Sequence, residues 1–176
     1  MTVSNPFANK VGAELKVGER LTLQLGDLNN EGTIEAGLID LKAGAIQNSG
    51  TINGGGLLVE SGSLNNTKTV SGGNVQIKTG TLTNTGAAAL ILASNDLSIE
   101  TTGRGTAADL LNQDGATIYS GSNMALNAGH IRNFSSTVEA GGNLSIKADL
   151  LENTRELVKE TVTTVSDPVV TEITDL

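Results

Sequence analysis

The feature that most constrains the fold is an internal repeat of 18 residues. Residues 28–81 contain the same pattern three times: an apolar anchor, an asparagine two positions later, and an alternating apolar stretch that ends at a glycine between small residues. The anchors lie at Leu28, Ile46, Leu64 and Leu82. A unit of this length is too short for a helix pair or a propeller blade. It suits one coil of a solenoid built from short strands, in which each coil packs on the next.

The alternation inside each unit predicts strands with one buried face. In Leu57-Leu58-Val59-Glu60, for example, Leu57 and Val59 would face the interior, and the residue after each would face the opposite side of the strand. If neighbouring coils pair as parallel strands about 4.8 Å apart, residues 18 apart lie above one another. Ile34, Ile52 and Val70 then form one internal column. A single coil buries too few side chains to offset the entropy of ordering its backbone, so stability is expected to belong to the stacked array.

The asparagine that follows each anchor predicts a ladder of side-chain hydrogen bonds. An amide side chain carries donors and acceptors, so each amide can bond to the amide of the next coil. We therefore interpret these asparagines as structural residues. The expected ladder consists of Asn30, Asn48, Asn66, Asn84, Asn133 and Asn153.

The repeat divides the chain into three parts. Residues 1–14 form a polar lead-in, expected either to be loosely ordered or to continue a preceding coil. Residues 15–153 are predicted to be an all-β parallel solenoid with coils of 18–20 residues. Residues 154–176 lose the pattern and suggest two extended stretches around a turn. They are expected to form either a hairpin that caps the last coil or a linker to another module.

A longer spacing after Leu82 predicts an insertion. Sequence spacing places the next anchor at Leu111, and the excess falls in residues 101–109. Insertions in solenoids project from one face as loops, so this segment is a candidate partner-binding loop. Arg104 lies between two glycines there, either as a contact for a partner or an anionic ligand or as a solvated charge. The candidate contact residues are Thr102, Arg104 and Asp109.

Composition narrows the classes of function. The net charge of −8 argues against nucleic acid or an anionic membrane as the main partner. The chain has no cysteine, which excludes a disulfide or a thiolate site. No apolar run approaches the ~20 residues of a membrane span. His130 is the single histidine, and its place at a corner predicts plain solvent exposure. We expect no metal and no cofactor.

An enzymatic interpretation has one candidate cluster. Asp96, Asp109 and Asp114 surround the insertion together with Arg104, and β-helices that act on polysaccharides use clustered carboxylates on one face. No aromatic platform for a sugar accompanies them, since the whole chain has two Phe, one Tyr and no Trp. We therefore expect that the chain is not an enzyme.

Several motifs together resemble the haemagglutinin repeats of the filamentous haemagglutinin family. They are the corner Leu28-Asn29-Asn30-Glu31-Gly32, its counterpart from Ile46 to Gly50, the step from Gly141 to Ile146, and the segment LNQDGATI from Leu111. The resemblance covers roughly residues 15–153. It implies a right-handed parallel β-helix that is secreted or lies on the cell surface of a Gram-negative bacterium. It also implies export of the parent protein by two-partner secretion, through an outer-membrane transporter.

The resemblance implies two kinds of parent protein. Some family members are adhesins, and others are contact-dependent growth inhibition proteins in which the repeats form the stalk that carries a toxin. We therefore expect a structural stalk used in adhesion or in contact-dependent toxin delivery. The alternative is a binding module that recognises a target-cell receptor or a host surface through residues 101–110 and the C-terminal segment.

Overall fold

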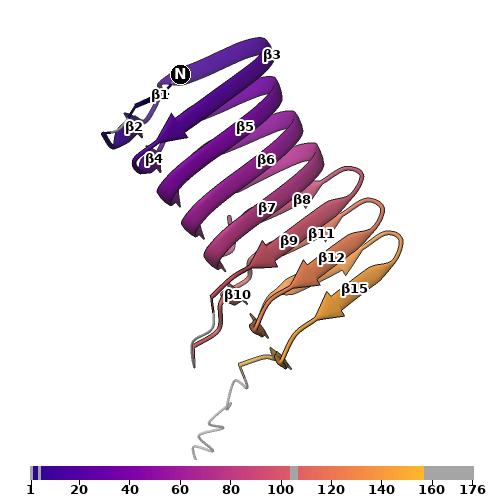
Figure 1. Cartoon of the computed structure of the whole chain (residues 1–176). Helices are drawn as coiled ribbons and strands as arrows, with labels where there is room; N and C mark the ends of the chain where they lie inside the picture. The colour runs from indigo at the N-terminus through magenta and orange to yellow at the C-terminus, as the bar shows by residue number, and fades with distance from the viewer. Residues whose placement is uncertain (1, 4, 104–106, 157–176) are drawn as a thin grey trace, which may run out of the picture.

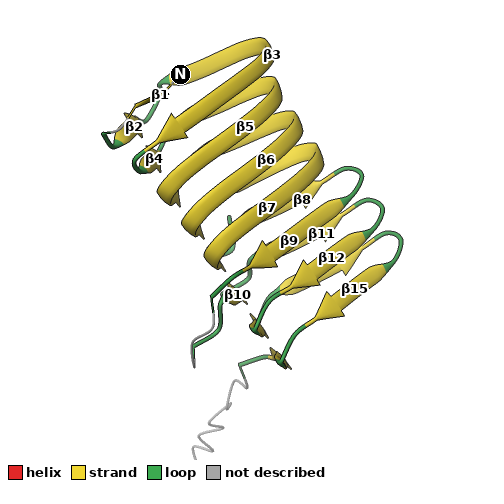
Figure 2. Ribbon diagram, in the orientation of Figure 1, coloured by secondary structure: helices red, strands yellow, loops and turns green. Residues whose placement is uncertain are grey.

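In the computed structural model the chain winds into a stack of parallel β-coils (Figure 1). The structure describes residues 2–3, 5–103 and 107–156. Every strand pair in this part is parallel, and the strands join into one sheet wound through about seven turns. The described residues form strands and loops only, so they include no helix that could cross a membrane (Figure 2). The prediction of an all-β parallel solenoid is confirmed, while its right-handed sense stays a prediction.

In the N-terminal half, most strands run on through the corners of a coil without a break. The longest of them have 16 or 17 residues, nearly the length of one repeat. The strands are β1 (Thr2–Val3), β2 (Phe7–Asn9), β3 (Glu14–Leu25), β4 (Leu28–Asn30), β5 (Thr33–Asn48), β6 (Thr51–Asn66) and β7 (Thr69–Thr85).

In the C-terminal half, each coil divides into three short strands joined by turns. Strands in equivalent positions of successive coils pair with one another, for example β8 with β11 and β11 with β14. The strands are β8 (Leu90–Ala93), β9 (Leu97–Thr101), β10 (Leu110–Gln113), β11 (Thr117–Ser120), β12 (Met124–Asn127), β13 (His130–Phe134), β14 (Thr137–Ala140), β15 (Leu144–Lys147) and β16 (Leu150–Thr154).

The register follows the repeat of the sequence. Ile34 pairs with Ile52, and Ile52 pairs with Val70, so these three side chains form an internal column. Each of them is at most 1% exposed. The core is therefore a bundle of such columns that runs the length of the stack, and every inner coil depends on its two neighbours for burial.

Glycine at the end of each regular unit lets the backbones of neighbouring coils approach closely. A Cβ added at Gly44 would lie 2.6 Å from the carbonyl oxygen of Gly26, and one added at Gly62 would lie 2.7 Å from that of Gly44. Real side chains do not tolerate such distances. This close contact explains why the small–glycine–small step recurs with the period of the coil.

The anchor after Leu82 is Leu110, and its assignment to Leu111 from the sequence was wrong. Leu110 pairs with Leu82 on one side and with Ile131 on the other, and it is 0% exposed. Leu111 faces outward in the column of Thr83. Two adjacent leucines leave the inward position ambiguous, because successive side chains in a strand point to opposite faces.

The polar lead-in supplies a strand to the stack. β2 pairs in parallel with β4, which places Phe7 beside Leu28 and Asn9 beside Asn30. Asn9 is 5% exposed. Residues 7–9 of the lead-in are therefore part of the stack.

Candidate functional site

The asparagine column is the most regular polar feature of the solenoid. In each step the Nδ2 of one asparagine donates to the Oδ1 of the asparagine in the next coil, at 2.7–2.8 Å. The rungs from Asn30 to Asn112 are at most 1% exposed. In chain order the rungs are Asn9, Asn30, Asn48, Asn66, Asn84, Asn112, Asn133 and Asn153.

The inner side-chain amides of this ladder have all their hydrogen-bonding groups paired within the fold. Asn48, for example, accepts from Asn30 and donates to Asn66 and to the carbonyl oxygen of Thr69. Because both donor hydrogens and the acceptor are occupied, each inner rung holds a corner of its coil and presents no free amide to a ligand.

Two rungs, Asn9 and Asn112, were absent from the ladder expected from the sequence. Asn112 follows Leu110 by two positions, which is the spacing of the other anchors, so a correct anchor would have identified it. Asn9 follows Phe7 by two positions as well. Its signal was hidden because an aromatic residue replaces the usual leucine or isoleucine.

Asp109 lies buried at the end of the insertion and accepts hydrogen bonds from both its own coil and the next one. It is 3% exposed, and its Oδ2 accepts from the hydroxyl of Thr101 at 2.8 Å and from the backbone N–H of Gly129 at 2.9 Å. Its Oδ1 accepts from the backbone N–H of His130. Burial raises the pKa of this carboxyl, but the hydrogen bonds from His130, Gly129 and Thr101 outweigh burial and lower the pKa below 3.8. The carboxylate therefore fastens the ends of the insertion to the next coil.

We expect the Asp109→Asn variant to lose about 1–3 kcal/mol of unfolding free energy at neutral pH, because one amide end cannot accept a backbone N–H. The wild-type carboxyl has a lowered pKa in the folded state, so its ionised form stabilises the fold above about pH 4 and this contribution is lost as the pH falls further. In denaturant titrations the stability difference should therefore be the same at about pH 7 and about pH 5 and should shrink as the pH falls through about 4 to about 3. A difference that is unchanged over this range would contradict the role of the charge.

The structure describes Thr102 but not Arg104, the other two residues of the insertion that were expected to contact a partner. Thr102 is exposed, and its backbone N–H donates to the carbonyl oxygen of Thr79 at 2.9 Å. It lies at the edge of a shallow groove that also includes Lys42, Glu60 and Lys78. Arg104 lies outside the described residues. Of the three candidates, the structure thus shows one surface residue, Thr102, and one internal residue, Asp109.

The three carboxylates considered for catalysis do not lie together in one site. Asp96 lies at the turn before β9, where its Oδ1 accepts from Asn123 at 3.0 and 3.1 Å. Asp114 lies at the turn after β10 and accepts from Thr85 at 3.0 Å. Asp109 bonds inside the insertion. These positions are three different corners of a coil, and no group of three or more His, Asp or Glu side chains among the described residues could hold a metal ion.

His130 is not the solvent-exposed side chain that its corner position predicted. Its side chain is 15% exposed, and its Nε2 lies 3.0 Å from Oε2 of Glu152 in the next coil. Beside it, the guanidinium of Arg132 lies 5.0 Å from the centroid of the Phe134 ring, a favourable cation–π distance. The three residues belong to β13 and contribute to the packing of the last coils.

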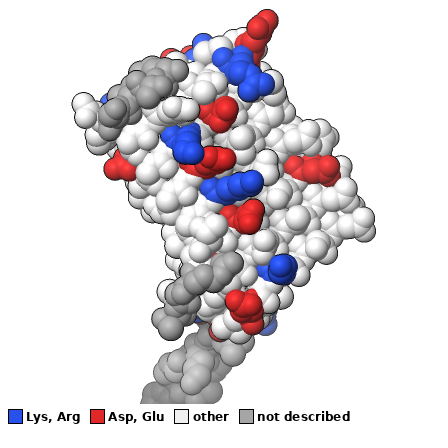
Figure 3. Space-filling view, viewed as in Figure 1, with Lys and Arg blue, Asp and Glu red and all other residues white. Residues whose placement is uncertain are grey.

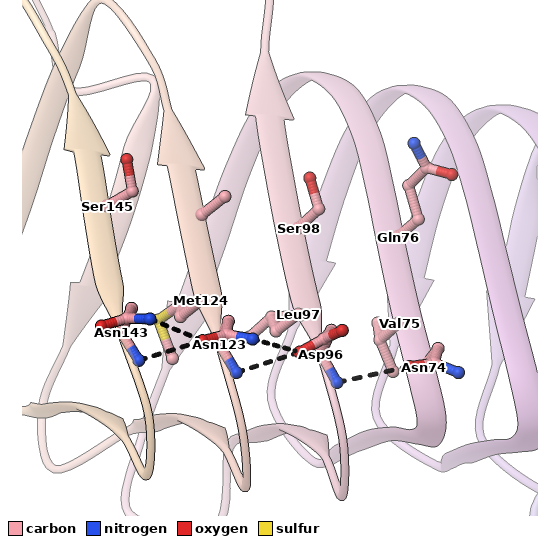
Figure 4. A pocket seen from close by; sticks show the side chains of 11 residues that line it. Asn74, Val75, Gln76, Asp96, Leu97, Ser98, Asn123, Met124, Asn143 and Ser145 are labelled. Carbon is pink, nitrogen blue, oxygen red and sulfur yellow. Dashed lines mark hydrogen bonds between the residues drawn. The ribbon is translucent and has the colours of Figure 1, made fainter.

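A shallow groove of about 530 Å³ lies on the outer face of the C-terminal coils (Figure 4). One wall is a row of turn residues in which Asn143 donates to Asn123, and Asn123 donates to Asp96. The other lining side chains are small or neutral, and Asp96 is the single ionisable group among them. The groove therefore has no acid–base pair, and its polar row serves mainly to join neighbouring turns.

Charged side chains on the solenoid alternate in sign along the stack. Lys42 pairs in register with Glu60, Glu60 with Lys78, and Lys78 with Glu100. The Nζ of Lys42 lies 3.2 Å from Oε2 of Glu60. Opposite charges lie side by side on this face (Figure 3). Such exposed pairs contribute little to stability, but their alternation keeps like charges from stacking between coils.

The fold and its internal ladders define a rod-forming β-solenoid whose polar residues are used mainly between coils. A family model described as the haemagglutinin repeat matches residues 17–103, 70–118 and 104–171. These matches together span most of the chain, and the protein belongs to the haemagglutinin-repeat family. Searches of the curated proteins and of the solved structures each find no match to it.

Family membership fits the geometry at a coarse level. Haemagglutinin-repeat proteins are structural or adhesive and not typically enzymatic, and they are typically secreted or found at the cell surface. The chain accordingly fits a segment of a stalk or an adhesin.

Proposed function

We propose that this chain is a stalk segment of a large exoprotein that acts at the surface of a Gram-negative bacterium, in adhesion or in contact-dependent toxin delivery. One observation carries the proposal: the asparagine ladder continues without a missing rung through the described coils, from Asn9 to Asn153. About seven turns at one strand spacing each give a rod of roughly 34 Å.

The architecture suits a long spacer that is built by repeating one short sequence unit. Each coil buries its apolar side chains against its neighbours, so the rod extends by addition of coils without a larger core. A solenoid of this kind can also form progressively from one end. We propose that the parent protein uses this property when it emerges from an outer-membrane transporter.

A second candidate function is recognition of a target-cell receptor or a host surface through the insertion. It is favoured by the position of Thr102, which is exposed beside a groove with Lys42, Glu60 and Lys78. This candidate is compatible with a stalk, because a loop that departs from the regular coils can carry contacts without altering the core.

Binding of the purified chain to intact bacterial and host cells separates the two functions. The matched variant replaces residues 102–108 by a short glycine–serine link and keeps Thr101 and Asp109, whose side chains already meet at 2.8 Å. A stalk predicts no saturable binding by either protein. Saturable binding by the natural chain that the variant loses would overturn the stalk as the whole function and assign recognition to the insertion.

A further inference from the structure

One outward row of side chains on the solenoid is complementary in charge to itself. The row crosses β5, β6, β7 and β9, and its charges alternate in sign from each coil to the next (Figure 3). An uncharged amide side chain lies at either end of the four charges. In chain order the row is Gln24, Lys42, Glu60, Lys78, Glu100 and Asn127. When the row is reversed and laid against itself, each cation meets an anion and each amide meets the other amide.

Contacts within the chain leave half of these charges unpaired. Among the described residues, the Nζ of Lys42 lies 3.2 Å from Oε2 of Glu60, whereas Lys78 and Glu100 form no ion pair. Lys78 is exposed and Glu100 is half-buried. The row therefore offers one cation and one anion, in adjacent coils, to a partner that carries the opposite order of charges.

The column next to this row carries little charge. Asp40 is its one ionisable member between β3 and β12, and the other side chains are neutral. In chain order the column is Thr22, Asp40, Leu58, Gln76, Ser98 and Ala125. A partner on this face would thus meet one alternating row beside a mainly uncharged strip (Figure 3).

We propose that this face binds the same face of a second copy of the chain, with the two rods antiparallel. A two-fold axis that runs along the strands reverses the order of the coils and keeps each position along a strand, so the row faces itself. Lys42 then faces Glu100 of the second copy, and Glu60 faces Lys78 of the second copy. The flanking amides, Gln24 and Asn127, face each other. All four charges of each copy gain an opposite partner.

The dimer is expected to be weak and selective. Six coils about 4.8 Å apart and strands of about five residues give a face of roughly 450 Å² on each copy. The total is at the lower end of the range for protein interfaces, where complexes are transient. Exposed ion pairs add little affinity, but they discriminate strongly against a partner that presents like charges.

Exchange of all four charges gives the sharpest test, because a reversed row complements itself but not the natural row. The reversed chain carries Lys42→Glu, Glu60→Lys, Lys78→Glu and Glu100→Lys. It keeps the net charge and the alternation between coils, so it should melt at the temperature of the natural chain. In sedimentation of the full-length proteins, each should form its own dimer with a similar Kd. A labelled natural chain should bind excess reversed chain at least about tenfold more weakly than excess natural chain.

The ionic strength should be about 0.1 M, where the Debye length is about 10 Å. Repulsion between two chains of net charge −8 is then damped, while contacts at a few ångströms persist.

A matched pair of single variants tests the row without a fourfold change. Lys78→Glu places like charges opposite each other in the dimer and should raise the Kd at least about tenfold. Lys68→Glu makes the same change of net charge at an exposed turn between β6 and β7, outside this face, and should leave the Kd unchanged.

Three results would overturn the proposal. A natural chain that stays monomeric up to about 1 mM would show that the face does not bind a second copy. Mixed dimers of natural and reversed chains as tight as the natural dimer would exclude antiparallel pairing of the row. Equal Kd values for Lys78→Glu and Lys68→Glu would place the contact elsewhere. The proposed stalk function is tested separately by cell binding, and none of these results would affect it.

Discussion

Replacement of Ile52 by aspartate is expected to abolish folding of the central coils. Ile52 is 1% exposed and lies between Ile34 and Val70 in an internal column of apolar side chains. A carboxylate in that position would be buried without a partner, at a cost of at least several kcal/mol. Because a domain of this kind is stable by only about 5–15 kcal/mol, we expect the cooperative thermal transition in circular dichroism to be lost or strongly lowered.

Two controls separate the buried charge from other effects of substitution. Ile52→Val keeps the apolar column and should cost about 0.5–1.5 kcal/mol. Gln47→Asp adds the same charge at an exposed position of β5 and should change stability by no more than about 0.5 kcal/mol. A melting transition of Ile52→Asp equal to that of Gln47→Asp would show that residue 52 does not belong to the internal column.

The second large effect is expected for Asn48→Leu, in the middle of the asparagine ladder. This change removes the acceptor of Asn30 and the donors to Asn66 and to the carbonyl oxygen of Thr69. Each buried polar group left without a partner costs about 1–3 kcal/mol. The combined loss should therefore be about 3–6 kcal/mol in denaturant unfolding.

Asn153→Leu is the matched control for the ladder. Asn153 is exposed and accepts one hydrogen bond from Asn133 at the end of the row. Water can replace that partner, so the loss should stay near or below about 1 kcal/mol. Equal losses at residues 48 and 153 would mean that the ladder is not what stabilises the central coils.

The sequence predicted the solenoid because each residue type that recurs with the 18-residue period has one structural role. An apolar anchor, an asparagine two positions later and a closing glycine correspond to an internal column, a ladder rung and a close backbone contact. The repeat failed to locate the anchor at Leu110, where a second leucine follows and the inward position is ambiguous, and at Phe7, where an aromatic residue replaces the usual leucine or isoleucine. Asn112 could have identified the correct anchor, because it follows Leu110 by the two positions that separate the other anchors from their asparagines.

The candidate site was less predictable, because burial at an insertion does not follow from the period. Asp109 was expected among surface contacts, yet it bonds inward to Thr101 and to the backbone of the next coil. His130 was expected in solvent, yet it lies against Glu152. Both contacts depend on which residues the following coil brings alongside, and the 18-residue period does not extend across the insertion.

Insertion of one additional coil tests the central claim most directly. The variant repeats residues 51–68 after Lys68, and its control repeats only residues 51–59 after Val59. The stacked-column account predicts that the whole-coil variant folds with an unchanged or higher melting temperature, since every column and the ladder gain one member in register. The half-coil control should melt far lower, because it shifts all later residues out of their columns. Equal melting temperatures for the two variants would contradict the solenoid account.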